Sequence, residues 1–205
     1  MKIGIMGGTF NPIHNGHLSL ANSSLDQFNL DEIWFMPSGL PAHKANDELL
    51  SADARLHMVT LAIAGKEKFK ASSFEIERNG FTYTADTMAA LANKYPDDEF
   101  YFIIGGDSLM KFHKWVRPEV ISAHTTLLAA GRNGYTSVEL ENQAQELKKQ
   151  FGTKVSFIEM PELVISSNEI RSFCKTKQYD TIKNMVPEAV FRYILEHELW
   201  KCPMN

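Results

Sequence analysis

Residues 2–18 read KIGIMGGTFNPIHNGHL. A short apolar run ends in two glycines, two histidines follow three residues apart, and an amphipathic segment comes next. This order predicts a buried strand, a tight turn and the start of a helix. Gly7 and Gly8 let the main chain adopt positive φ and let a ligand approach it closely. Because a helix start points N–H groups and partial positive charge at the turn, the stretch predicts an anion site of phosphate size.

The two histidines of this stretch suit chemistry on phosphate. His14 and His17 lie one helical turn apart in the predicted helix and would face the same way. Both could then donate ring N–H groups to phosphate oxygens, which suits charge that builds up in a transition state. Taken alone, the residues also fit a glycine-rich turn with two surface histidines, and that alternative stays open at this point.

Predicted strands alternate with predicted helices along the rest of the chain. This alternation predicts an α/β fold, a doubly wound parallel sheet with Rossmann-like order in a single domain. The run at 99–104 is the most apolar and is expected at the centre of the sheet. The other strands are expected at 31–36, 69–78, 125–130 and 154–158, and helices after His17, over 52–64 with Leu56, Val59 and Ile63 buried, after Thr84, over 140–151 and from Pro187 as a first helical residue.

Composition limits the class of protein. The chain has 205 residues, 44% of them hydrophobic and 22% charged, which is typical of one globular domain, expected to span 1–205. A net charge of −4 disfavours a general nucleic-acid binder. No apolar run is long enough for a membrane span and no signal peptide is apparent, so we expect no membrane partner and a cytoplasmic location. Cys174 and Cys202 are expected as reduced thiols. A homo-oligomer is left open.

A second motif lies at residues 165–171, which read ISSNEIR. Ser166 and Glu169 have the spacing of a capping box, which predicts a helix start with Arg171 one turn inside. The N–H groups of such a start can bind phosphate, and the planar, permanently charged fork of Arg171 suits phosphate oxygens. The helical part at about 166–200 therefore carries a second phosphate-binding motif.

Residues 7–17 resemble the GGxFxPxHxGH signature of a nucleotidyltransferase superfamily whose other hallmark is an ISSTxIR segment near the C-terminus. The two motifs stand here in the same order, about 150 residues apart. Between them, residues 37–44, 80–87 and 104–115 resemble the bacterial nicotinate-nucleotide adenylyltransferases. The resemblance covers nearly the whole chain. Asn11 stands where that family often has Asp, and Asn168 where it usually has Thr, which leaves the assignment intact but makes a shifted substrate preference conceivable.

The resemblance implies an enzyme of NAD biosynthesis that joins ATP and nicotinate mononucleotide to give deamido-NAD and pyrophosphate. The mononucleotide phosphate would attack the α-phosphorus directly and in line, with His14 and His17 stabilising the charge there and Arg171 holding the leaving pyrophosphate. Since a phosphate monoester is largely ionised at neutral pH, no strong general base is needed. The residues expected to bind ATP are Gly7, Gly8, Thr9, Phe10, Gly105, Asp107, Ile165, Ser166, Ser167 and Arg171, and those expected to bind the mononucleotide are Lys44, Thr84 and Trp115.

Each of these roles has a simpler structural alternative. Lys44 also fits a solvated surface lysine, and Thr84 fits the N-cap of its helix. Asp107, expected to accept ribose hydroxyls, also fits the N-cap of the next helix. Trp115, expected to stack on the pyridine ring, also fits a core or partly exposed aromatic. The sequence has no carboxylate cluster for a metal, so Mg²⁺ is expected to arrive with ATP rather than in a protein cage.

Other functions fit less well. The first motif is not a GxGxxG fingerprint and no GxxxxGK[ST] loop occurs, which disfavours a dehydrogenase and excludes the P-loop class. Phosphopantetheine adenylyltransferase belongs to the same superfamily but is generally shorter and would not explain residues 82–87 or Trp115. A non-enzymatic nucleotide-binding module remains as the alternative from another class, although intact His14, His17 and Arg171 argue against it.

Overall fold

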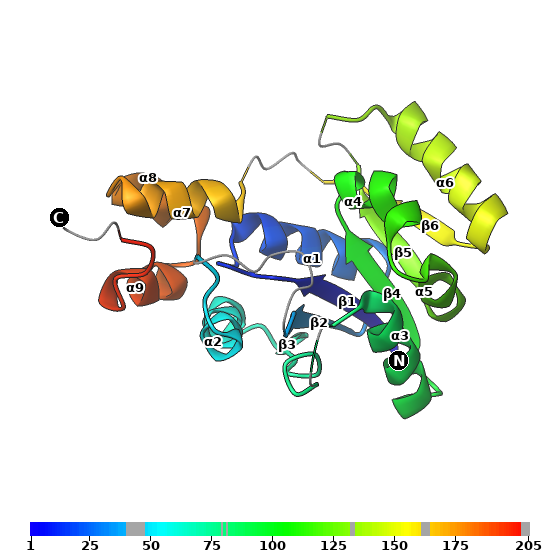
Figure 1. Ribbon diagram of the computed structural model, residues 1–205, viewed down its shortest axis with the longest axis horizontal. Helices are drawn as coiled ribbons and strands as arrows, with labels where there is room; N and C mark the ends of the chain where they lie inside the picture. The colour runs from blue at the N-terminus through cyan, green and yellow to red at the C-terminus, as the bar shows by residue number, and fades with distance from the viewer. Residues whose placement is uncertain (40–47, 79, 81, 132–133, 161–164, 202–205) are drawn as a thin grey trace.

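The computed structural model describes residues 1–205 with the exception of 40–47, 79, 81, 132–133, 161–164 and 202–205 (Figure 1). Within the described residues, six parallel strands form one sheet in the order β3-β2-β1-β4-β5-β6. This order confirms the predicted Rossmann-like, doubly wound fold. The strands are β1 (Lys2–Gly8), β2 (Glu32–Pro37), β3 (Phe69–Ala71), β4 (Glu99–Ile104), β5 (Thr126–Ala130) and β6 (Lys154–Ile158).

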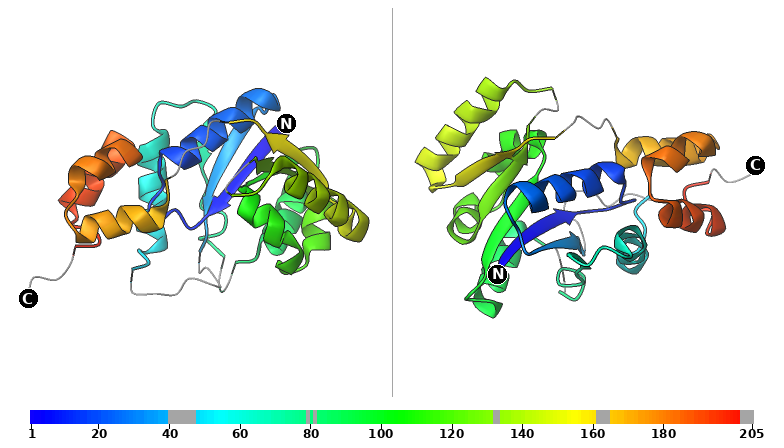
Figure 2. Two further views of the ribbon diagram at one scale, coloured as in Figure 1. Left: turned by 90° about the horizontal axis from the view of Figure 1, so that it is seen from above. Right: turned by 180° about the vertical axis from the view of Figure 1, so that it is seen from behind.

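Helices cover both faces of this sheet (Figures 1 and 2). Buried side chains of α1, α2, α7, α8 and α9 form one core with one face, and those of α3, α4, α5 and α6 form a second core with the other. The helices are α1 (Asn15–Gln27), α2 (Ala52–Ile63), α3 (Thr84–Lys94), α4 (Gly106–Lys111), the 3₁₀ helix η1 (Phe112–Lys114), α5 (Pro118–His124), α6 (Ser137–Phe151), α7 (Ser167–Lys175), α8 (Tyr179–Met185) and α9 (Glu188–Glu196).

Strand β4 lies near the middle of the sheet, as its apolar run predicts. Ile103 belongs to one core, whereas Phe102 and Ile104 on either side of it belong to the other. Successive side chains of a strand point to opposite faces, so a strand covered on both faces must be apolar throughout. The strand therefore delivers Gly105 to the edge of the sheet where β1 also ends.

The third strand is shorter than predicted. The expectation of a strand over 69–78 is wrong beyond Ala71, because the chain leaves the sheet after Ser72 donates its N–H to the Phe35 carbonyl. It turns so that the buried Glu75 carboxylate accepts a hydrogen bond from Thr87 Oγ1 in α3, at 2.7 Å. The alternating residues after Ala71 therefore do not form a strand, and Glu75 among them makes a tertiary contact with α3.

Two helix starts are displaced by one residue from their predicted places. Thr84 is the first helical residue of α3, and Tyr83, not Thr84, occupies the N-cap. Pro187 is the N-cap of α9 instead of its first helical residue. On α2, Leu56 is only partly buried, whereas Arg55, which the prediction left out, is buried.

The helices α7, α8 and α9 lie together at the end of the molecule toward which β1 points (Figure 2). They bring the second motif to the carboxyl ends of the strands.

Cys174 of α7 is a buried free thiol, and burial raises its pKa to about 11, whereas Cys202 lies outside the described residues. Among the helices that the structure describes, none is both long and apolar enough to cross a membrane.

Candidate active site

Two neighbouring cavities, of about 760 Å³ and about 560 Å³, open at the carboxyl ends of the central strands. The site lies where the strand order reverses between β1 and β4, the usual place for ligands in such sheets. The larger cavity brings together all the residues predicted for ATP and for catalysis, and Thr84 and Trp115 line the smaller one. The residues so gathered in the larger cavity are Gly7, Gly8, Thr9, Phe10, His14, His17, Gly105, Asp107, Ile165, Ser166, Ser167 and Arg171.

The two cavities share a wall. Gly7, Gly8, Thr9, His17 and Gly105 line both of them. Leu20 of α1 and Ser108 of α4 line both cavities as well, so the wall combines the end of β1 and its turn, the start of α4 after β4, and two side chains of α1, one of them the His17 imidazole. A ligand in either cavity therefore reaches the same short stretch of main chain and the same histidine.

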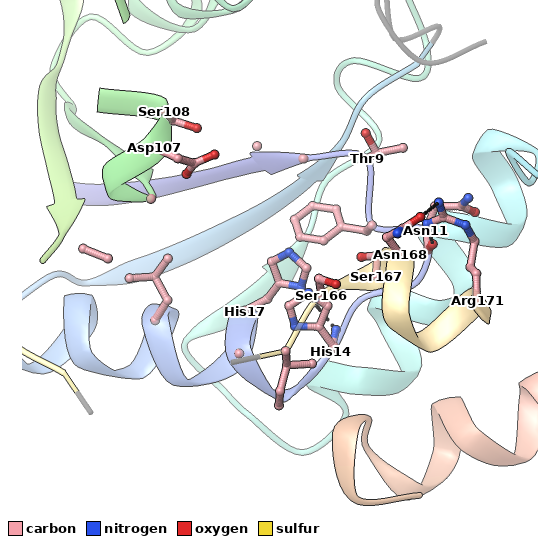
Figure 3. A pocket seen from close by; sticks show the side chains of 18 of the residues that line it. Thr9, Asn11, His14, His17, Asp107, Ser108, Ser166, Ser167, Asn168 and Arg171 are labelled. Carbon is pink, nitrogen blue, oxygen red and sulfur yellow. Dashed lines mark hydrogen bonds between the residues drawn. The ribbon is translucent and has the colours of Figure 1, made fainter. Parts of the chain in front are cut away.

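The start of α1 sets the geometry of the two histidines. His14 is the N-cap and its ring lies against that of His17, with centroids 3.7 Å apart and an interplanar angle of 31°. This confirms that the two side chains face the same way, as Figure 3 shows. The His14 main-chain N–H donates to His17 Nδ1 at 3.2 Å. Because a ring nitrogen that accepts a hydrogen bond carries no proton, neutral His17 holds its proton on Nε2 and is a donor there.

Two neighbours fix these rings in place. Phe10, buried and with φ at 49°, sets its ring edge-on to His17 with centroids 5.0 Å apart. A Cβ atom added to Gly16 would lie 3.1 Å from His14 Nδ1, which is tighter than ordinary side-chain contacts. The glycine between the two histidines therefore makes room for the first of them.

His14 is almost fully buried, and this changes its titration. Burial lowers the pKa of His14 from its usual 6.5 to about 4, although the Glu169 carboxylate acts in the opposite direction. The imidazole is therefore neutral at pH 7. Among the described residues, no hydrogen-bond partner reaches its buried Nδ1.

The lowered pKa of His14 predicts a loss of stability in mild acid. Because the unfolded chain takes up the proton near pH 6.5 and the folded chain only near pH 4, stability is complete above pH 6.5 and falls as the pH drops toward 4. Between pH 7 and pH 5 the loss is about 2 kcal/mol. His14→Asn keeps a good N-cap residue that does not titrate, so this variant should lose about 2 kcal/mol less over the same range. Urea unfolding at the two pH values measures this, and parallel losses in both proteins would contradict it.

The second motif docks on the first. Ser166 caps α7 with the predicted capping box, accepting from the Glu169 N–H at 3.2 Å while its own N–H donates to the Glu169 carboxylate at 3.1 Å. Ser167 Oγ donates to the Pro12 carbonyl at 2.8 Å, which ties the start of α7 to the turn after β1. Figure 3 shows Ser166, Ser167 and Arg171 on one side of the histidines, with Asp107 across the cavity.

Arg171 is held from three sides. Its Nε donates to Glu48 at 2.9 Å, one terminal nitrogen donates to the Asn11 carbonyl at 3.0 Å, and the other donates to Asn168 Oδ1 at 3.2 Å. Glu48 also pairs with Lys175, and these two cations lower the pKa of its carboxyl. Both departures from the family motifs, Asn11 and Asn168, therefore touch the same guanidinium.

The remaining predicted residues are placed as follows. Asp107 is exposed in the first turn of α4, whose N-cap is Gly105, so the alternative of Asp107 as an N-cap is wrong. Trp115 is half-buried and packs against Phe102 and Phe112, with its ring on the wall of the smaller cavity. Lys44 lies outside the described residues.

Several residues near the site were not found from the sequence. Ser108 lines both cavities, next to the predicted Asp107. Glu48 accepts a hydrogen bond from Arg171, and Arg55 donates one to the Thr9 carbonyl. Neither residue belongs to a motif. For Arg55 the sequence did contain a signal. The buried face of α2 consists of positions 55, 58, 59, 62 and 63, and an amphipathic helix normally carries apolar residues on that face, so an arginine there is unusual.

The described residues contain no group of three or more His, Cys, Asp or Glu side chains that could hold a metal ion. Asp107 is the single acidic side chain among the described residues that line the larger cavity. One carboxylate can contribute to the coordination of Mg²⁺ that arrives on a polyphosphate, but it cannot form a cage.

Comparison with known proteins shows the family to which the chain belongs. A family model described as cytidylyltransferase-like matches residues 5–173. A protein of Lachnoclostridium phytofermentans named "Probable nicotinate-nucleotide adenylyltransferase" is 43% identical over 196 residues, covering 96% of this chain and 97% of that protein. A protein of Bacillus cereus with the same name is 40% identical over 200 residues, covering 98% of each.

Solved structures show the same fold. Plasmodium falciparum nicotinic acid mononucleotide adenylyltransferase, complexed with NaAD, superimposes with a TM-score of 0.79 at 23% identity, over 97% of each chain. Fold and motifs together therefore define a nucleotidyltransferase of the cytidylyltransferase-like family. Within it, the chain belongs to the nicotinate-nucleotide adenylyltransferases, to which its full-length relatives at 40–43% identity are assigned.

Proposed function

We propose that this protein transfers the adenylyl group of ATP to nicotinate mononucleotide, giving deamido-NAD and pyrophosphate. The observation that carries this proposal is the wall that the two cavities share at the turn after β1 and at His17. Two nucleotides bound side by side would present their phosphates to the same turn, as a direct transfer requires. The names of the relatives, and the NaAD bound to the Plasmodium enzyme, support the same pair of substrates.

The reaction is a single displacement. An oxygen of the mononucleotide phosphate forms a bond to the α-phosphorus of ATP, and the bond from that phosphorus to the oxygen bridging to the β-phosphate breaks. No proton has to be removed from the nucleophile, which is already ionised at neutral pH. The residues therefore act by positioning the two phosphates and by stabilising charge on the oxygens of the α-phosphate.

The side chains divide this work between them. His17 donates from Nε2, the position that its bond with the His14 N–H leaves protonated. Neutral His14 gains a partner for its ring when a phosphate oxygen arrives. At the start of α7, main-chain N–H groups and Ser166, Ser167 and Arg171 hold the β and γ phosphates. Mg²⁺ carried with ATP would neutralise part of the charge of the leaving pyrophosphate, and Asp107 would contact that ion or the ribose.

The start of α3 suits the carboxylate of the pyridine ring. The first N–H groups of a helix have no partner within the helix, and Thr84, the first residue of α3, lines the smaller cavity. Together with the Trp115 ring, they would seat an aromatic acid in preference to the corresponding amide. For this reason we assign nicotinate mononucleotide, and not nicotinamide mononucleotide, as the acceptor. The cytoplasm stays the predicted location.

Pyrophosphate release with Mg-ATP tests this assignment. We expect release that depends on nicotinate mononucleotide, and at least tenfold lower kcat/KM with the amide, because the amide forfeits a charge-assisted hydrogen bond to the helix start. Identification of the dinucleotide completes the assay. Turnover with the amide alone would keep the chemistry and overturn the substrate. ATP binding without turnover would favour a nucleotide-binding module, and turnover with phosphopantetheine would move the protein to another branch.

A further inference from the structure

A buried arginine lies behind the wall shared by the two cavities. Arg55 of α2 is only 1% exposed, and among the described residues no carboxylate pairs with it. Taking an arginine out of water is expensive unless its N–H groups are satisfied. Burial accordingly lowers its pKa. Because burial of this guanidinium costs free energy and Arg55 belongs to no motif, we expect the residue to have a physical role in the protein.

Among the described residues, the side chain of Arg55 donates to main-chain carbonyls alone. Nε donates to Leu50 at 3.1 Å, one terminal nitrogen donates to Thr9 at 2.8 Å, and the other donates to Ser38 at 2.7 Å and to Gly39 at 2.9 Å. These carbonyls belong to three separate segments: the turn after β1, the chain just after β2 and the residue before the N-cap of α2. One planar cation therefore joins segments that are far apart in the sequence.

The segments joined in this way form the walls of the site. Thr9 lines both cavities, Ser38 lines the smaller one and Leu49, next to Leu50, lines the larger one. The main chain at Gly39 is packed so closely that an added Cβ atom would lie 2.7 Å from the Glu75 carbonyl oxygen. Residues 38–39 thus lie between the Arg55 guanidinium and Glu75, with no room for a side chain at position 39.

We infer that Arg55 is a positioning residue for adenylyl transfer: its guanidinium sets the spacing between the two nucleotide cavities by holding Thr9 against Ser38, Gly39 and Leu50. This inference rests on the proposed function. Transfer depends on how close the attacking phosphate lies to the α-phosphorus, and a displacement of about 1 Å can cost about 100-fold in rate. Since Arg55 acts on the main chain behind the site, it touches neither substrate.

Two variants of Arg55 and one matched control test this inference. Arg55→Lys keeps the charge but replaces a planar fork by a single ammonium, and Arg55→Met removes the charge. Met58→Ala alters a fully buried side chain one turn further along the same helix that packs in the apolar core. It therefore disturbs α2 without touching any carbonyl of the site.

We expect kcat to fall about 100-fold in Arg55→Met and at least tenfold in Arg55→Lys, with KM for the mononucleotide raised in both. Met58→Ala should lower Tm while kcat per folded molecule and both KM values stay at the wild-type level. If Arg55→Met does not fold, Arg55→Lys decides. Arginine variants that lose Tm but keep wild-type kcat and KM would overturn the inference. A wild-type protein without turnover would instead refute the proposed function, so the two failures are distinguishable.

Discussion

Replacement of His17 by Ala should lower kcat for adenylyl transfer about 10²–10³-fold, the usual cost of removing one preorganised donor to a developing charge. The reason is the position of its protonated Nε2, which the bond between the His14 N–H and Nδ1 fixes. The same substitution removes a capping contact at the start of α1 and should cost about 1 kcal/mol in unfolding free energy. Steady-state kinetics with Mg-ATP and nicotinate mononucleotide, together with urea unfolding, measure both effects.

A glutamine at position 17 separates the two effects. His17→Gln places an amide oxygen where the His14 N–H can donate to it, as in an ordinary capping box, and leaves an N–H₂ group as donor. This variant should keep wild-type stability and lose less activity than His17→Ala. His124→Ala removes an exposed histidine at the end of α5 and is the matched control, expected at wild-type rate. Near-normal turnover of His17→Ala would remove His17 from the catalytic residues.

Replacement of Arg171 by Ala should lower kcat/KM for ATP about 100-fold, because a bidentate, permanently charged contact to the leaving phosphates is lost. The structure adds a second consequence. Without Arg171, the Asn11 carbonyl and Asn168 Oδ1 lose a donor, and Glu48 keeps Lys175 as its remaining cationic partner among the described residues. We therefore expect a lower Tm as well, and Arg171→Lys should recover stability better than kcat/KM.

Arg192→Ala is the control for this prediction. Arg192 pairs with Glu188 on the exposed surface of α9 and lines neither cavity of the site. Exposed pairs of this kind contribute little to stability, so Tm and kcat/KM should both stay at the wild-type level. An Arg171→Ala protein that loses Tm but keeps its kcat/KM for ATP would show that Arg171 only holds Glu48 and the start of α7.

The sequence was most informative where backbone conformation and ligand chemistry depend on the same residues. The Ser166–Glu169 capping box specifies a helix start by local rules, so its neighbours could be placed from the sequence. Gly7 and Gly8 mark the end of β1, but the expectation of positive φ there is wrong: both belong to the strand, and Phe10 adopts the positive φ of the turn. The apolar run of β4 likewise predicted a central strand. Because these elements end at the same edge of the sheet, the cavity that gathers both motifs follows from them.

What the sequence could not reveal depends on contacts between distant segments. The place of Arg55 on the apolar face of α2 marks it as unusual, but the sequence cannot show what it binds, because its acceptors are main-chain carbonyls that carry no sequence signal. Glu48 was missed for the same reason, since its partners on α7 lie more than a hundred residues away. The end of β3 was misplaced because a tertiary bond between Glu75 and Thr87 overrides the alternating pattern.

The configuration at the α-phosphorus of the product tests the central claim most directly. The claim is that the two cavities hold two nucleotides for one direct, in-line transfer. With Mg²⁺, nicotinate mononucleotide and a single diastereomer of ATP that carries sulfur at the α-phosphate, we predict a thio-substituted dinucleotide with inverted configuration, read by ³¹P NMR. Retention would mean two successive displacements through an adenylylated enzyme, and the account of a single direct transfer would be wrong.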